Sequence, residues 1–146
     1  MPDLPDNEIA RFGQQLTMVI IATFGLILPI VLIPIITFTG YSETIEEIAK
    51  AVVILLFVTK LPSLRSRILA ALLLGGAFGI SESILYLVNV WQLGDSAPFW
   101  MRVSSTVPMH MLTASILMLS VHRTRYAIPI GLALALAVHL GFNSLV

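Results

Sequence analysis

Apolar residues dominate this chain in five long runs, and polar residues gather in the short stretches between them. Each run has nearly the length that an α-helix needs to cross a bilayer, which is about 20 apolar residues. Residues 1–14 are more polar, and we expect them to form a short tail before a single transmembrane domain, residues 15–146. The predicted spans are approximately 15–38, 42–60, 66–92, 103–122 and 126–146.

The composition supports a membrane protein and excludes several other classes. Hydrophobic residues make up 58% of the 146 residues and charged residues 11%, with a mean hydropathy of +0.97. Such a chain predicts an all-α fold, a polytopic bundle of membrane helices. A net charge of zero without a basic patch excludes nucleic-acid binding, and the absence of cysteine excludes thiol catalysis. The acidic N-terminus lacks the basic region of a signal peptide, so we expect the first run to remain as a span.

Basic residues predict the orientation of the bundle, because they favour the cytoplasmic side of short membrane loops. The side that carries the N-terminus has six of them, against only Arg102 on the opposite side. We therefore expect the N-terminus to be cytoplasmic and, after five spans, the C-terminus to lie outside. The six residues are Arg11, Lys60, Arg65, Arg67, Arg123 and Arg125.

A few strongly polar residues fall inside the predicted spans. An ionisable group in a membrane helix is costly unless it faces protein or water, so each of these residues is a candidate for function. With a rise of about 1.5 Å per residue, all of them fall in the outer half of the bilayer, on four different spans. We therefore predict that they meet in one layer. They are Glu46, Glu47, Lys50, Glu82, His110, His139 and Asn143.

The acidic residues at the start of the second span divide into two groups. Glu46 and Glu47 precede Lys50 by four and three residues, so the lysine can pair with either carboxylate on one helix face. Adjacent residues of a helix point about 100° apart, so both acids cannot face water comfortably. We therefore favour a functional role for Glu46 and Glu47 and a plain interfacial anchor for Glu43.

Four short motifs along the chain resemble those of one family. They are "EEIAK" at 46–50, "FGISESILY" at 78–86, "VPMHMLTAS" at 107–115 and "HLGFNS" at 139–144. In this order they resemble the motifs of the PrsW family of intramembrane proteases, which is related to the CAAX prenyl endopeptidases and the wider ABI group. The resemblance covers the second to fifth spans and implies a glutamate-dependent membrane protease.

Peptide hydrolysis needs an activated water, a group that stabilises the oxyanion and a proton donor for the leaving amine. The resemblance implies that Glu46 is the base and that His110 holds the water from a facing helix. It also implies that His139 and Asn143, four residues apart on one helix face, line the oxyanion side.

The remaining acids are expected to support this chemistry. Glu47 would stabilise the helix packing or position Lys50, and Glu82 would orient a histidine or share a proton with Glu46. The predicted catalytic set is therefore Glu46, Glu47, Glu82, His110, His139 and Asn143.

A metal cofactor is the open point of this mechanism. Two histidines with several glutamates also suit a zinc site that keeps one position open. However, the chain has no His-Glu-x-x-His spacing, and the glutamate-dependent interpretation of the family favours no cofactor. We therefore expect no metal; if zinc is bound, its ligands are Glu46, His110 and His139.

The expected partner is a membrane-anchored protein substrate, and the resemblance suggests an anti-sigma factor cut near the outer face of a cell membrane that the chain crosses several times. Four alternatives stay open at this point. They are a CAAX-type processing protease, a proton- or ion-coupled membrane protein, a haem protein with His110 and His139 as axial ligands, and an inactive ABI-like immunity or scaffold protein.

Overall fold

The regular structure of the protein is entirely helical over residues 6–90 and 97–145, which are the residues that the computed structural model describes. This confirms the predicted all-α helix bundle. Two short 3₁₀ turns, η1 (Val58–Lys60) and η3 (Arg125–Ala127), follow the second and fourth helices. The helices are α1 (Asp6–Thr39), α2 (Ser42–Leu56), α3 (Leu64–Val90), α4 (Ala97–Arg123) and α5 (Ile128–Asn143).

Three of the helices are long and apolar enough to cross a membrane. Their candidate spans are Asn7–Thr39, Leu64–Leu87 and Phe99–Arg123. In contrast, α2 has 15 residues and α5 has 16, so both are shorter than the spans that the sequence predicted at 42–60 and 126–146.

The first helix is longer than predicted. It begins at Asp6, so much of the stretch that was expected to form a polar tail is helical. The physical reason is the composition of residues 7–16, since Glu, Ala, Arg, Gln and Leu all favour a helix although several of them are polar. Hydropathy therefore located the apolar part of the helix rather than its start.

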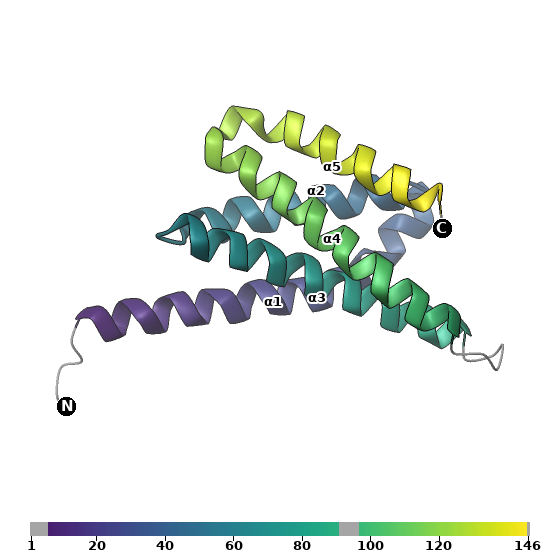
Figure 1. Ribbon diagram of the computed structural model, residues 1–146, viewed down its shortest axis with the longest axis horizontal. Coiled ribbons are helices and arrows are strands. Elements are labelled where there is room, and N and C mark those ends of the chain that lie inside the picture. The colour runs from purple at the N-terminus through teal and green to yellow at the C-terminus, as the bar shows by residue number, and fades with distance from the viewer. Residues whose placement is uncertain (1–5, 91–96, 146) are drawn as a thin grey trace.

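Successive helices run in alternating directions along the bundle, so the start of α1 and the end of α5 lie at opposite ends (Figure 1). The turn between α1 and α2 is made at Gly40, whose φ of +74° is a backbone conformation that side chains other than glycine rarely adopt. One apolar core joins all five helices. Ile21, Ile54, Leu74, Leu117 and Ala135, one from each helix, are almost fully buried in it.

The pair α3 and α4 is the most extensive contact between helices, and it depends on glycine. A Cβ atom on Gly75 would collide with the backbone carbonyl group of His110, and one on Gly79 would lie 2.8 Å from the Cα of Val107. In contrast, a Cβ on Gly76 would meet only the flexible side chain of Met111 at 3.7 Å. Gly75 and Gly79 therefore let the backbone of α4 approach α3 closely.

We expect Gly75→Ala to destabilise the bundle by about 1–3 kcal/mol, because the added methyl group forces α3 and α4 apart. Gly76→Ala is the matched control, since its methyl group has room, and it should leave stability unchanged or slightly raised through helix propensity. Thermal unfolding of the purified variants in detergent checks both. Equal unfolding temperatures for Gly75→Ala and the wild type would contradict the close contact.

Candidate active site

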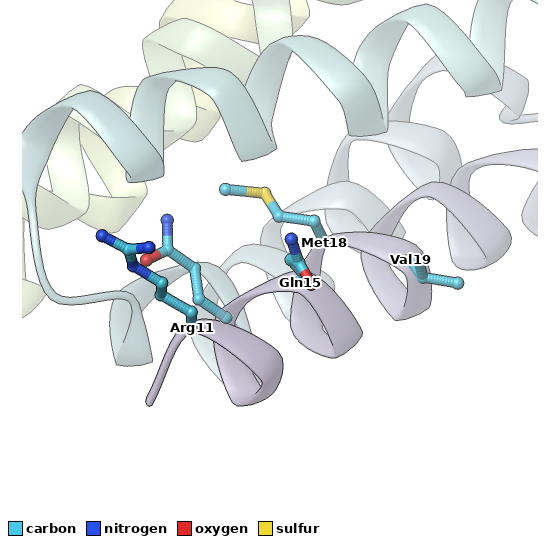
Figure 2. Close-up of a pocket in the computed structure, with 5 residues that line it drawn as sticks. Arg11, Gln15, Met18 and Val19 are labelled. Atoms are coloured by element: carbon cyan, nitrogen blue, oxygen red, sulfur yellow. The ribbon is translucent and has the colours of Figure 1, made fainter. Parts of the chain in front are cut away.

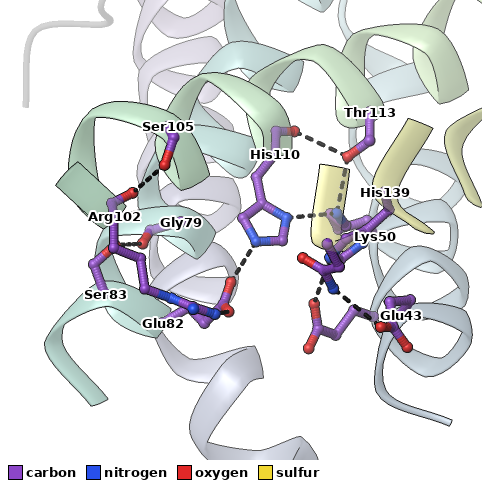
Figure 3. A network of polar contacts seen from close by, with 12 residues as sticks. Glu43, Lys50, Gly79, Glu82, Ser83, Arg102, Ser105, His110, Thr113 and His139 are labelled. Atoms are coloured by element: carbon purple, nitrogen blue, oxygen red, sulfur yellow. Dashed lines mark hydrogen bonds and ion pairs between the residues drawn. The ribbon is translucent and has the colours of Figure 1, made fainter. Parts of the chain in front are cut away.

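Four helices bring their polar side chains together inside the bundle (Figure 3). Lys50 from α2 contacts His110 from α4, which contacts Glu82 from α3, while His139 from α5 contacts Glu47 of α2. Five of the six residues in the predicted catalytic set therefore belong to one cluster, which we call the polar network. Its members are Glu46, Glu47, Lys50, Glu82, His110 and His139.

Lys50 lies at the centre of the polar network and is completely buried. Its Nζ donates to Glu47 Oε1 at 2.6 Å and to Thr113 Oγ1 at 2.9 Å, and it lies 2.9 Å from His110 Nδ1. The ring of Phe78 covers the same ammonium at 5.0 Å from its centroid. An ammonium group has three hydrogens to donate, and here each has an acceptor.

The contacts of His110 determine which of its ring nitrogens carries the proton. An ammonium can only donate, so Nδ1 must accept the hydrogen bond from Lys50. The proton of a neutral His110 is then on Nε2, which donates to Glu82 Oε2 at 2.5 Å. The ring is fully buried, with the centroid of Phe78 at 4.8 Å on one side, and it lies so close to Gly79 that a Cβ there would be 3.2 Å from its Cδ2.

His139 has the opposite arrangement. Its Nδ1 donates to Glu47 Oε1 at 2.8 Å, which leaves Nε2 with a free lone pair. That nitrogen lies 3.9 Å from Glu46 Oε2, which is beyond hydrogen-bonding distance. Among the residues that the structure describes, Glu46 Oε2 is buried without any hydrogen-bond partner. A buried carboxylate oxygen without a partner is costly, so it indicates a place for a ligand or water.

Glu82 connects the polar network to the surface. Its Oε1 accepts from Arg102 Nη2 at 3.2 Å, and the Arg102 guanidinium stacks over the ring of Tyr86 at 4.5 Å. The Glu82 side chain is 25% exposed, whereas His110 beside it is fully buried. Glu82 therefore lies at the mouth of the site, where water can reach it.

Asn143 lies outside the polar network. Its side chain is exposed, and its Nδ2 donates to Glu43 Oε1 at 3.0 Å. This bond ties the end of α5 to the start of α2, next to the pair formed by Ser42 Oγ and Glu43 Oε2 at 2.9 Å. In this structure Asn143 therefore joins the end of α5 to the start of α2 and does not belong to the polar network.

Sequence reasoning missed two partners, Thr113 and Arg102. Thr113 follows His110 by three residues, so helical spacing puts both on one face of α4. Arg102 precedes His110 by eight residues, close to two helical turns, and the same rule could have found it. The sequence analysis used Arg102 only to predict orientation and gave the hydroxyl of Thr113 no role, because hydroxyls are common in membrane helices.

The polar network contains a set of groups that can hold a metal ion. Glu46, His110 and His139 each offer a ligand atom, and these atoms lie within 4.8 Å of one another. Two histidines and one carboxylate form a known donor set for catalytic zinc. The partnerless Glu46 Oε2 and the free His139 Nε2 fit this interpretation, and Glu47 and Glu82 accept hydrogen bonds from the histidines as outer partners of zinc ligands do.

A surface hollow along α1 is separate from the polar network (Figure 2). It measures about 390 Å³ and is lined by Arg11, Gln14, Gln15, Met18 and Val19, all from the first half of α1. None of the predicted catalytic residues lines it, so it adds nothing to the candidate site.

Comparison with known proteins agrees with the motif resemblance. A family model described as "PrsW family intramembrane metalloprotease" matches residues 14–146, which is nearly the whole chain. No curated protein and no solved structure matches the chain. The protein is therefore a membrane protease, a peptide hydrolase whose substrate is a membrane-embedded protein.

The expectation that the site uses no cofactor is wrong. The family is one of metalloproteases, and the structure gathers Glu46, His110 and His139 in a group that can hold a metal. The absence of His-Glu-x-x-His spacing misled the sequence analysis, because that rule describes ligands on a single helix. Here α2, α4 and α5 each contribute one residue of this group, and no local spacing can reveal such an arrangement. By the match of its sequence, this chain belongs to the PrsW family of intramembrane metalloproteases.

Proposed function

We propose that the polar network is the active site of an intramembrane endopeptidase, where Glu46, His110 and His139 hold a divalent metal ion. The observation that carries this proposal is the pair of free donor atoms, Glu46 Oε2 and His139 Nε2, which lie 3.9 Å apart inside the polar network. A divalent metal in such a site polarises the substrate carbonyl and makes a bound water acidic enough to attack it.

The residues of the chain supply the proton transfers and the orientation. The attacking water must lose a proton, and with Oε2 on the metal Glu46 would accept it through its other carboxylate oxygen. The leaving amine must gain that proton, and Glu82, whose side chain is 25% exposed, is the carboxylate of the polar network through which it would pass. Peptide hydrolysis is then balanced: water gives its hydroxyl to the carbonyl carbon and its proton to the amine.

Glu47 and Glu82 act as positioning residues. Each accepts a hydrogen bond from one histidine, which holds the imidazole in one tautomer and one orientation. The oxyanion role predicted for Asn143 stays a prediction, since its amide would have to leave Glu43 to act.

The substrate is proposed to be cut near the extracytoplasmic face of the cell membrane, as the distribution of basic residues predicts. Arg102 is the one basic residue expected on that side, and it contacts Glu82 of the polar network. A membrane-anchored anti-sigma factor is the substrate that the family resemblance suggests.

A haem protein is disfavoured among the alternatives. The rings of His110 and His139 are perpendicular and 5.1 Å apart between centroids, in an edge contact that leaves no space for a porphyrin between them. Both ring nitrogens of His110 also have partners already.

We expect Glu46→Gln to abolish proteolysis, by a factor of about 100 or more, because the amide neither accepts the proton nor binds a metal well. Glu43→Gln is the matched control: it lies one helical turn earlier on α2, outside the polar network, and should keep most of the activity. Proteomic comparison of membranes that carry wild type, Glu46→Gln or Glu43→Gln identifies a substrate that accumulates only with the first variant. Full proteolysis by Glu46→Gln would refute the assignment.

Removal of the metal provides a separate test. Purified protein should carry a single divalent ion per chain, and His139→Ala should lose it, because this change removes one of three ligands. Treatment with a chelator should stop cleavage of the substrate, and added zinc should restore it. Elemental analysis of the same samples reports the metal directly, and a metal-free sample with full activity would contradict the proposal.

A further inference from the structure

The hydrogen bonds of His110 conflict with its role as a metal ligand. A histidine binds a metal through a lone pair on one ring nitrogen. In this structure Nε2 carries the proton that Glu82 accepts, and the lone pair of Nδ1 accepts a hydrogen bond from Lys50 at 2.9 Å. Of the three ligands, only Glu46 and His139 therefore have a free donor atom.

Of the two hydrogen bonds of His110, the one from Nε2 to Glu82 would remain when a metal is bound. Zinc-binding histidines usually donate their second ring nitrogen to a carboxylate, as Nε2 of His110 does here. Nδ1 is then the ligand nitrogen, and the position in front of its lone pair is taken by the Lys50 ammonium. Figure 3 shows the ring of His110 between Glu82 on one side and Lys50 on the other.

Lys50 can leave this position without losing its other partners. Its contacts to Glu47 Oε1 and Thr113 Oγ1 lie on two different helices and satisfy two of its three donors. A small rotation of the side chain would therefore break the bond to His110 and keep an ion pair and a hydrogen bond. A divalent ion would also repel the ammonium, because the two charges have the same sign.

We propose that Lys50 is a positioning residue that competes with the metal: its ammonium occupies the His110 Nδ1 lone pair in the metal-free protein and must be displaced before the third ligand can bind. This inference rests on the proposed metal site. Lys50 then has two roles, since it compensates the buried charge of Glu47 when the metal is absent and lowers the affinity for the metal.

The test is a zinc titration of purified protein in detergent against a competing chromophoric chelator. Lys50→Met should bind zinc about tenfold more tightly or better, since a hydrogen bond to a charged group and a repulsive charge are both removed. Lys60→Met is the matched control: it makes the same change in η1, beyond the end of α2 and over the ring of Phe57, and should leave the affinity unchanged.

The variant His110→Ala completes a double-mutant cycle. It should weaken zinc binding much more in the Lys50→Met background than in the wild type, because His110 is available as a ligand only when Lys50 does not mask it. Equal losses in both backgrounds, or an unchanged affinity of Lys50→Met, would overturn the competition and leave the metal site itself standing. If none of these proteins binds zinc, both the competition and the metal site are overturned. Proteolysis by Glu46→Gln tests the enzymatic role separately.

A measurement on the wild type needs no variant of Lys50. Nitrogen NMR of ¹⁵N-histidine-labelled, zinc-free protein should show His110 protonated on Nε2 with an accepting Nδ1, and assignment uses the loss of its signals in His110→Ala. A proton on Nδ1 in the metal-free protein would overturn the proposal, because that nitrogen could not then accept from Lys50.

Discussion

The ion pair between Lys50 and Glu47 is the interaction on which the rest of the site depends. Both side chains are fully buried, and an isolated charge in such surroundings would be strongly unfavourable. The pair is tolerated because each charge has further partners: Thr113 and His110 for the ammonium, and His139 for the carboxylate. These partners come from α4 and α5, so satisfying one ion pair requires three helices to be in position together.

The packing of α3 against α4 stabilises the fold and also positions side chains of the polar network. Gly75 lies against the backbone of His110, and Gly79 leaves the space that its ring occupies. On the same helix as these glycines, Glu82 follows Gly79 by three residues and therefore faces the same neighbour. The small residues that let the helices approach are thus the reason that the carboxylate of Glu82 reaches His110.

The sequence predicted the fold class and most of the polar network, because an ionisable residue in a membrane helix is costly and is therefore a candidate for function. Glu46, Glu47, Glu82, His110 and His139 could be found from their polarity alone. What it could not show was how they pair. The tautomers of the histidines and the partnerless oxygen of Glu46 depend on contacts between helices, which no spacing within one helix determines. The exposed position of Asn143 was not predicted for the same reason. The start of α1 was missed for a different reason, since hydropathy does not detect polar residues that favour a helix.

The two helices that supply Glu46 and His139 are also the short ones. A helix of 15 or 16 residues rises about 22 to 24 Å, less than the roughly 30 Å of a bilayer's hydrocarbon core. If α2 and α5 cross the bilayer with the other helices, lipid next to them would meet a hydrophobic mismatch, which a bilayer relieves by becoming locally thinner. Thinning would shorten the distance from the headgroup region to the polar network on this side of the bundle. Helix length would then bring both water and the flanking residues of a substrate nearer to the proposed site.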